Sequence, residues 1–158
     1  VHIPADIAPA LEDEAMEIAR KIAEAIEVVG ILAVEFFVLD GELLVNELAA
    51  RPHNSGHLTI EASATSQFEN HLRAVTGLPL GPTDRIVPAA AMANIVGQTR
   101  GEPQDQSFRS DVFIHMYGKT PRPGRKLGHV TAIADTTDQA IERALDTAKE
   151  LEQESEMS

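Results

Sequence analysis

Apolar residues near the start of the chain repeat with the spacing of an amphipathic helix. They recur three or four positions apart from Leu11 to Val29, which places them on one face of a helix. Pro9 lies near the beginning of this stretch and Gly30 just past its end, and these residue types favour helix starts and stops. The pattern predicts an N-terminal helix.

Two apolar runs after this helix indicate a β-hairpin. Residues 31–39 are almost entirely apolar, and Leu43-Leu44-Val45 form a second run. Asp40-Gly41 between them is a strong signal for a tight hairpin turn. We expect a largely buried first strand.

A loop and a second helix follow. Residues 49–58 show no period and contain Pro, Gly, Asn and Ser, which is typical of a loop. A helix is expected over about 66–76, with Gly77 as its stop. Residues 77–83 suit neither a helix nor a sheet, so we place a boundary there between residues 1–83 and residues 84–158.

The second part of the chain is expected to be rich in strands. Residues 86–96, 111–117 and 127–134 are predicted strands, although the alanines of the first would also suit a helix. Thr136 and Gln139 make a capping box that opens a final helix. Its expected buried side comprises Ala140, Ile141, Ala144, Leu145, Ala148 and Leu151, and the tail after Glu152 should fray. The predicted class is α+β.

Composition and charge narrow the function classes. The 158 residues carry a net charge of −12, which argues against general nucleic-acid binding. Residues 1–30 and 138–158 each hold seven acidic and two basic residues, so the middle carries only −2. Cysteine is absent and no apolar run could span a membrane, so we expect a soluble, cytoplasmic protein. Since the chain begins with Val1, we also expect a partial or processed polypeptide.

Polar side chains in the hairpin suggest a cation site. Glu35 lies inside an apolar strand, where a carboxylate is costly unless satisfied, and Asn46-Glu47 end the returning strand. With only Asp40-Gly41 in the turn, Glu35 lies opposite Asn46; one extra loop residue or a bulge places it opposite Glu47. In either register, oxygen ligands of the kind that Mg²⁺ prefers meet across the hairpin. An exposed Glu35, or one paired with an arginine, is the alternative.

The loop that follows is dense in polar groups. Arg51-Pro-His-Asn-Ser-Gly-His57 combines an arginine able to clamp a phosphate with two histidines. Two histidines on an irregular loop make a weak zinc signal, and Ser55 does not lie in a Gly-x-Ser-x-Gly elbow.

A basic segment lies in the second part. Lys119, Arg122, Arg125 and Lys126 give a local charge of +4 among Gly and Pro residues. Such a turn could present several donors to one small phosphate, or it could be a solubilising hairpin tip.

Together, four segments resemble the 5-(carboxyamino)imidazole ribonucleotide synthase family of ATP-grasp ligases. They are Val34-Glu-Phe-Phe37, Val45 to His57, Thr65-Ser-Gln-Phe-Glu69, and Tyr117-Gly-Lys119 with Arg122 to His129. The resemblance spans essentially the whole chain, but only as the C-terminal part of that enzyme. It implies the end of an ATP-grasp lobe followed by a small β-rich domain with a closing helix.

The resemblance also implies an activity. The family uses ATP and Mg²⁺, or Mn²⁺, to activate bicarbonate as carboxyphosphate and then carboxylates aminoimidazole ribonucleotide. By resemblance, Glu35, Asn46 and Glu47 hold the metal, and Asn46 and Glu47 face ATP. Arg51, His53 and Asn54 are catalytic candidates, with His57 lining the adjoining pocket. Lys119, Arg125 and Lys126 take the ribonucleotide phosphate.

Other interpretations of the function remain open at this point. Ala50 stands where the family commonly has proline, and nothing resembles the family's N-terminal domain or its ATP-gripping lysines. We therefore expect a fragment that is inactive alone, needs the rest of the enzyme, and belongs to a homodimer that binds neither nucleic acid nor membranes. The alternatives are another ATP-grasp ligase, such as formate-dependent glycinamide ribonucleotide transformylase, and a non-catalytic interaction module.

Overall fold

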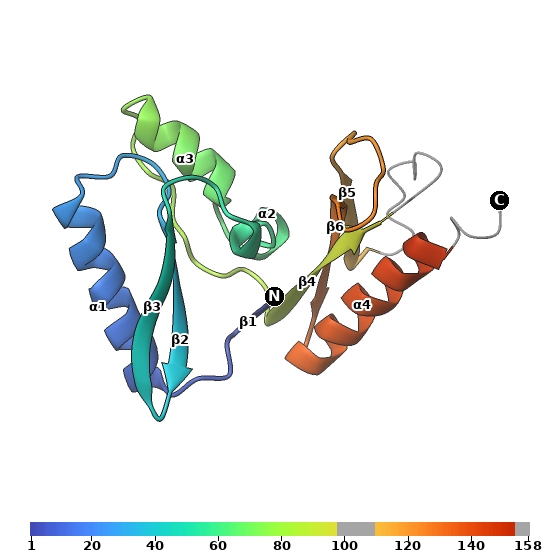
Figure 1. The fold of residues 1–158 in the computed structure, drawn as a ribbon, viewed down its shortest axis with the longest axis horizontal. Helices are drawn as coiled ribbons and strands as arrows, with labels where there is room; N and C mark the ends of the chain where they lie inside the picture. Colours follow the sequence, from blue (N-terminus) through green and yellow to red (C-terminus); the bar gives the residue numbers. More distant parts are fainter. Residues whose placement is uncertain (98–109, 154–158) are drawn as a thin grey trace. The chain divides into compact units, whose positions relative to one another are not determined.

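The computed structural model describes residues 1–97 and 110–153, and the chain divides into two units (Figure 1). Ala5–Asp84 form one, which we call the hairpin unit. Val1–Pro4 join the chain from Arg85 onward in the other, which we call the sheet unit. The first four residues, which the sequence placed with the first part, therefore belong with the second.

The hairpin unit begins with α1 (Pro9–Ala25). This helix ends earlier than the apolar pattern predicts, because the backbone turns at Ile26 and Glu27 takes a left-handed φ of 50°. Gly30 is not the helix stop: a Cβ there would lie 2.7 Å from Nδ1 of His71, so this glycine permits a close approach. The expected helix is confirmed, and its predicted end is wrong.

The hairpin comprises β2 (Ala33–Leu39) and β3 (Glu42–Ala49). Asp40 and Gly41 have φ values of 51° and 84°, the positive angles that a two-residue turn requires. Leu39 pairs with Glu42, and the register continues until a bulge between Glu35 and Phe36. The returning strand runs further than its apolar run suggests.

Three short elements complete this unit. The expected loop contains the 3₁₀ turn η1 (Asn54–Gly56), and α2 (Thr59–Ala62) follows it. The second predicted helix is α3 (Gln67–Val75), where the Ser66 hydroxyl accepts a hydrogen bond from the Glu69 amide.

The sheet unit contains a four-stranded antiparallel sheet with the order β1-β4-β6-β5. Its strands are β1 (His2–Ile3), β4 (Ala89–Val96), β5 (Val112–Met116) and β6 (Lys126–Ala134). The alanine-rich segment is thus a strand, because it pairs with β6 along its whole length. The two residues of β1 are too few to give a sequence pattern.

One face of this sheet is covered by α4 (Thr137–Gln153) (Figure 1). Ala140, Ala144 and Ala148 pack against buried strand residues that include Ile95 and Val130. Leu145, expected on the buried side, is 46% exposed because it lies to one side of this alanine stripe. The α+β class is confirmed, whereas the expected fraying concerns residues 154–158, which lie outside the described residues. No helix in the described ranges is long and apolar enough to cross a membrane.

Candidate functional site

Two carboxylates face each other across the hairpin. Glu35 on β2 pairs with Glu47 on β3, because the bulge next to Glu35 leaves Asn46 as the extra residue of β3. Residues directly opposite in an antiparallel pair project to the same face of the sheet. Like charges in this position destabilise the hairpin unless a cation or a proton donor lies between them.

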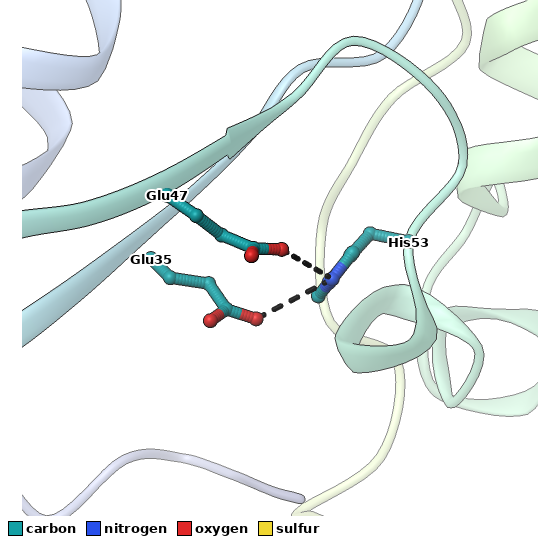
Figure 2. A group of neighbouring side chains, drawn as sticks. All are labelled: Glu35, Glu47 and His53. Carbon is teal, nitrogen blue, oxygen red and sulfur yellow. Dashed lines mark ion pairs between the residues drawn. The ribbon is translucent and has the colours of Figure 1, made fainter.

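The imidazole of His53 lies beside both carboxylates (Figure 2). Its Nε2 atom is 3.3 Å from Oε1 of Glu35 and 3.9 Å from Oε1 of Glu47. The His53 side chain is only 12% exposed, whereas those of Glu35 and Glu47 are 41% and 56% exposed. The loop therefore brings a largely buried ring nitrogen to two solvated carboxylates.

The contacts of Ser55 favour one neutral form of His53. Nδ1 of His53 lies 2.8 Å from Oγ of Ser55 and accepts a 3.3 Å hydrogen bond from the Ser55 amide. Because the Ser55 amide can only donate, Nδ1 is an acceptor and Nε2 of the neutral ring carries the proton, which it donates toward Glu35. The other neutral form, with a lone pair on Nε2, needs Nδ1 to donate to Oγ and loses the bond from the Ser55 amide. The hydrogen bonds to Ser55 therefore favour a proton on Nε2.

The three side chains also fit a metal ion. One ligand atom each from Glu35, Glu47 and His53 lie within 4.8 Å of one another. Paired carboxylates suit Mg²⁺ and Mn²⁺, which prefer oxygen ligands, and an imidazole is the less usual member of such a set. Asn46 donates a 3.3 Å hydrogen bond from Nδ2 to Oε2 of Glu35, so its amide orients this carboxylate.

The other expected residues of this loop lie around His53. Asn54 opens η1, and Arg51 is exposed with a 3.1 Å hydrogen bond from Nη1 to the Pro52 carbonyl. The ring of His57 lies 5.2 Å from that of Phe68 and contacts the Gln67 amide through Nδ1 at 2.9 Å. These three side chains are not members of the carboxylate–histidine group.

Gln67, to which the sequence reasoning gave no role, is the residue that ties the loop to α3. Its side-chain amide bonds both the backbone N–H and the backbone carbonyl of His53, at 2.9 and 2.8 Å. The only sequence signal was its presence in the Thr65 to Glu69 segment, because a single glutamine at a helix start has no pattern of its own.

The basic segment belongs to the sheet unit and connects β5 to β6. Nζ of Lys119 lies 4.6 Å from the ring centre of Tyr117 and 3.4 Å from the Lys126 carbonyl. Arg125 donates from Nη1 to the Thr120 carbonyl at 3.0 Å, and the Lys126 side chain is exposed. The connection therefore contains Lys119, Arg122 and Arg125, and Lys126 follows as the first residue of β6.

A buried histidine, His129, contacts Tyr117 at the start of this connection. The Tyr117 hydroxyl lies 2.7 Å from Nδ1 of His129, which is 2% exposed and stacks on His115 with ring centres 4.6 Å apart. Burial raises the pKa of the Tyr117 phenol above its ordinary value, which disfavours the phenolate. In the sequence, His129 is marked only as the last residue of the Arg122 to His129 segment.

Two family models match the chain. Residues 1–68 match the ATP-grasp domain, and residues 90–143 match the phosphoribosylaminoimidazole carboxylase C-terminal domain. The two matches fall in the hairpin unit and the sheet unit respectively, apart from the first four residues.

Relatives and solved structures agree with both models. The chain is 47% identical over 150 residues to the N5-carboxyaminoimidazole ribonucleotide synthase of Mycobacterium bovis, covering 87% of the chain and 35% of the relative. It is 44% identical over 143 residues to that of Bacillus subtilis, covering 89% and 37%. The Thermotoga maritima N5-carboxyaminoimidazole ribonucleotide synthetase structure gives a TM-score of 0.83 at 42% identity, covering 94% of this chain and 44% of that one.

Several related structures contain nucleotides. The Aspergillus clavatus N5-carboxyaminoimidazole synthase in complex with ADP and 5-aminoimidazole ribonucleotide gives a TM-score of 0.78 at 35% identity, covering 94% of this chain and 43% of that one. The chain spans little more than a third of the length of the curated relatives it matches. Over that span, the chain belongs to the N5-carboxyaminoimidazole ribonucleotide synthase family of ATP-grasp ligases.

Proposed function

We propose that the protein to which this chain belongs carboxylates 5-aminoimidazole ribonucleotide with bicarbonate, using ATP and releasing ADP and phosphate. The observation that carries the proposal is the group formed by Glu35, Glu47 and His53. The relatives of the chain are named N5-carboxyaminoimidazole ribonucleotide synthases, which supports the same activity. A related structure contains ADP and the aminoimidazole ribonucleotide, which supports both ligand classes.

Glu35 and Glu47 would hold Mg²⁺ or Mn²⁺, with Asn46 and Glu47 on the side that faces ATP. A bound divalent cation supplies charge neutralisation for in-line transfer of the γ-phosphoryl group. Asn46 orients Glu35 through its 3.3 Å hydrogen bond, which keeps that carboxylate facing the cation.

The loop beside the carboxylates would handle bicarbonate and its activated form. Arg51 is exposed, so its guanidinium can turn toward a phosphoryl or carboxyphosphate anion, whose charge it would stabilise. His53 would hold or accept a proton at Nε2, as its contacts with Ser55 allow. Asn54 and His57 would line the adjoining pocket.

The connection between β5 and β6 would take the 5′-phosphate of the ribonucleotide. Lys119, Arg125 and Lys126 supply donors with no acidic residue among them. The remaining segments of the active site, including the groups that grip the ATP phosphates, would come from the part of the enzyme that corresponds to the unmatched length of the relatives. A homodimer in the cytoplasm is the assembly and location that we propose.

A chimera tests this function. Its N-terminal part is taken from the Bacillus subtilis relative and its C-terminal part is this chain. We expect bicarbonate- and ribonucleotide-dependent release of ADP, with labelled bicarbonate entering the product. Glu47→Gln should lower kcat by at least about 100-fold, because it removes a ligand of the metal. Glu42→Gln, an exposed glutamate on the same strand, should leave kcat unchanged.

Three results would overturn the proposal. Incorporation of labelled formate in place of bicarbonate would indicate the transformylase alternative. Full turnover in the Glu47→Gln chimera would show that these carboxylates hold no essential metal. A chimera that folds and binds ATP but never turns over would favour a non-catalytic module.

A further inference from the structure

We propose that Gln67 is a positioning residue that sets the place of the His53 imidazole against the carboxylates of Glu35 and Glu47. The inference deepens the proposed function, on which it rests. It concerns a residue whose side chain bonds the backbone of His53 and so acts on the imidazole through the loop backbone.

The Gln67 side chain substitutes for a neighbouring strand. Oε1 accepts the His53 amide at 2.9 Å, and Nε2 donates to the His53 carbonyl at 2.8 Å. Both backbone groups of one loop residue are therefore satisfied by a single planar amide, as they would be in a β-ladder. Since Gln67 is only 9% exposed, these bonds are shielded from competing water.

Neighbouring residues prevent this amide from moving. Its Nε2 also lies 2.9 Å from Nδ1 of His57, and the Gln67 backbone N–H donates to Oγ1 of Thr59 at 2.9 Å. Thr59 in turn donates to the Gly56 carbonyl at 2.6 Å. A Cβ at Gly56 would lie 2.5 Å from Oε1 of Gln67, so the glycine leaves the space that the amide needs.

The two halves of the site are thus held by different means. The hairpin register places Glu35 and Glu47, whereas the backbone bonds to Gln67 place His53. Disrupting Gln67 should therefore displace the histidine and leave the two carboxylates where they are. A residue needed only for general stability would affect both halves alike.

The test follows Mn²⁺-induced broadening of NMR signals in the 158-residue chain. In the unsubstituted chain, Mn²⁺ should broaden signals of Glu35, Glu47 and the His53 ring together. In Gln67→Leu, broadening of the His53 ring should fall relative to that of the glutamates. Exchange of the His53 amide proton should also accelerate about fivefold, as expected for loss of one hydrogen bond. Gln139→Leu, an exposed glutamine of α4, is the matched control and should change neither.

A conservative variant guards against simple misfolding. Gln67→Glu has the same shape and retains an acceptor for the His53 amide, but it loses the donor to the His53 carbonyl. Exchange of the His53 amide proton should therefore be slower in Gln67→Glu than in Gln67→Leu, without full recovery. Unchanged His53 exchange and ring broadening in Gln67→Leu would overturn the inference, as would parallel losses at His53 and both glutamates in both variants. If Mn²⁺ broadens nothing in the unsubstituted chain, the proposed metal site fails, and the exchange rates, which need no metal, decide the role of Gln67.

Discussion

Glu35 and Glu47 are placed where their charges oppose each other. They face one another in the hairpin register. Figure 2 shows the His53 imidazole beside both carboxylates. Directly opposed like charges weaken an antiparallel pair of strands. A bound cation would convert this repulsion into attraction.

Tyr117 gives a prediction for the titration of a single side chain. It is the only tyrosine in the chain, which contains no tryptophan, so phenolate absorbance reports this residue alone. Burial raises its pKa above the ordinary value of 10.0. The native chain should therefore form phenolate at a higher pH than the denatured chain does.

The sign of the stability effect follows from proton linkage. Above about pH 10 the unfolded state loses the phenolic proton while the folded state retains it, so folding stability should fall as pH rises further. Tyr117→Phe should remove both the absorbance change and the contribution of this group. A native chain that titrates at or below the denatured one would contradict the prediction.

At the scale of elements, the approach of β5 to β6 depends on Gly128. A Cβ at this position would lie 2.4 Å from the His115 carbonyl oxygen, closer than any packed pair of atoms allows. Met116 and Gly128 are paired residues, and the basic connection begins directly after β5. The geometry of that connection is therefore coupled to a glycine in the adjoining strand.

We expect Gly128→Ala to separate the two strands locally. Overpacking against backbone costs about 1–3 kcal/mol, so amide exchange across β5 and β6 should accelerate by about tenfold or more. Gly41→Ala is a useful comparison: it meets nothing within 4 Å but must adopt a φ of 84°, at a cost of about 1 kcal/mol confined to the hairpin. Protected β5 and β6 amides in Gly128→Ala would contradict the expectation.

At the scale of the whole molecule, the hairpin leaves much apolar surface uncovered. Phe37, Val38 and Leu39 are 60%, 52% and 58% exposed, and a two-stranded sheet has marginal stability by itself. The relatives contain further sequence, because the chain spans only 35% of the Mycobacterium bovis protein. We therefore expect the proposed chemistry to need groups from the rest of the enzyme as well.

We accordingly predict that the purified chain alone neither binds ATP tightly nor turns it over. Equilibrium dialysis with labelled nucleotide measures the first property, and ADP release in the presence of bicarbonate and aminoimidazole ribonucleotide measures the second. Robust carboxylation by the chain alone would show that the carboxylate–histidine group and the basic connection suffice.

Local patterns decided much of the fold in advance. The helix before the hairpin, the Asp40-Gly41 turn, α3 and α4 all follow from residues a few positions apart. Predictions were weaker where contacts between distant segments determine the local structure. These features are the end of α1, the strand identity of the alanine-rich β4, and the exposure of Leu145. In each case the deciding contact or backbone angle involves packing that the local pattern does not contain.

The sequence by itself determined which chemistry is present: two carboxylates, an amide and a histidine-bearing loop in one stretch, and a run of cations in another. Only the tertiary structure decided which of the two hairpin registers applies, because a bulge is a property of paired strands. It also decided that His53 joins the glutamates and that Gln67 holds it there. Residue types and short-range order are local properties of a chain, whereas convergence of side chains depends on how its segments pack.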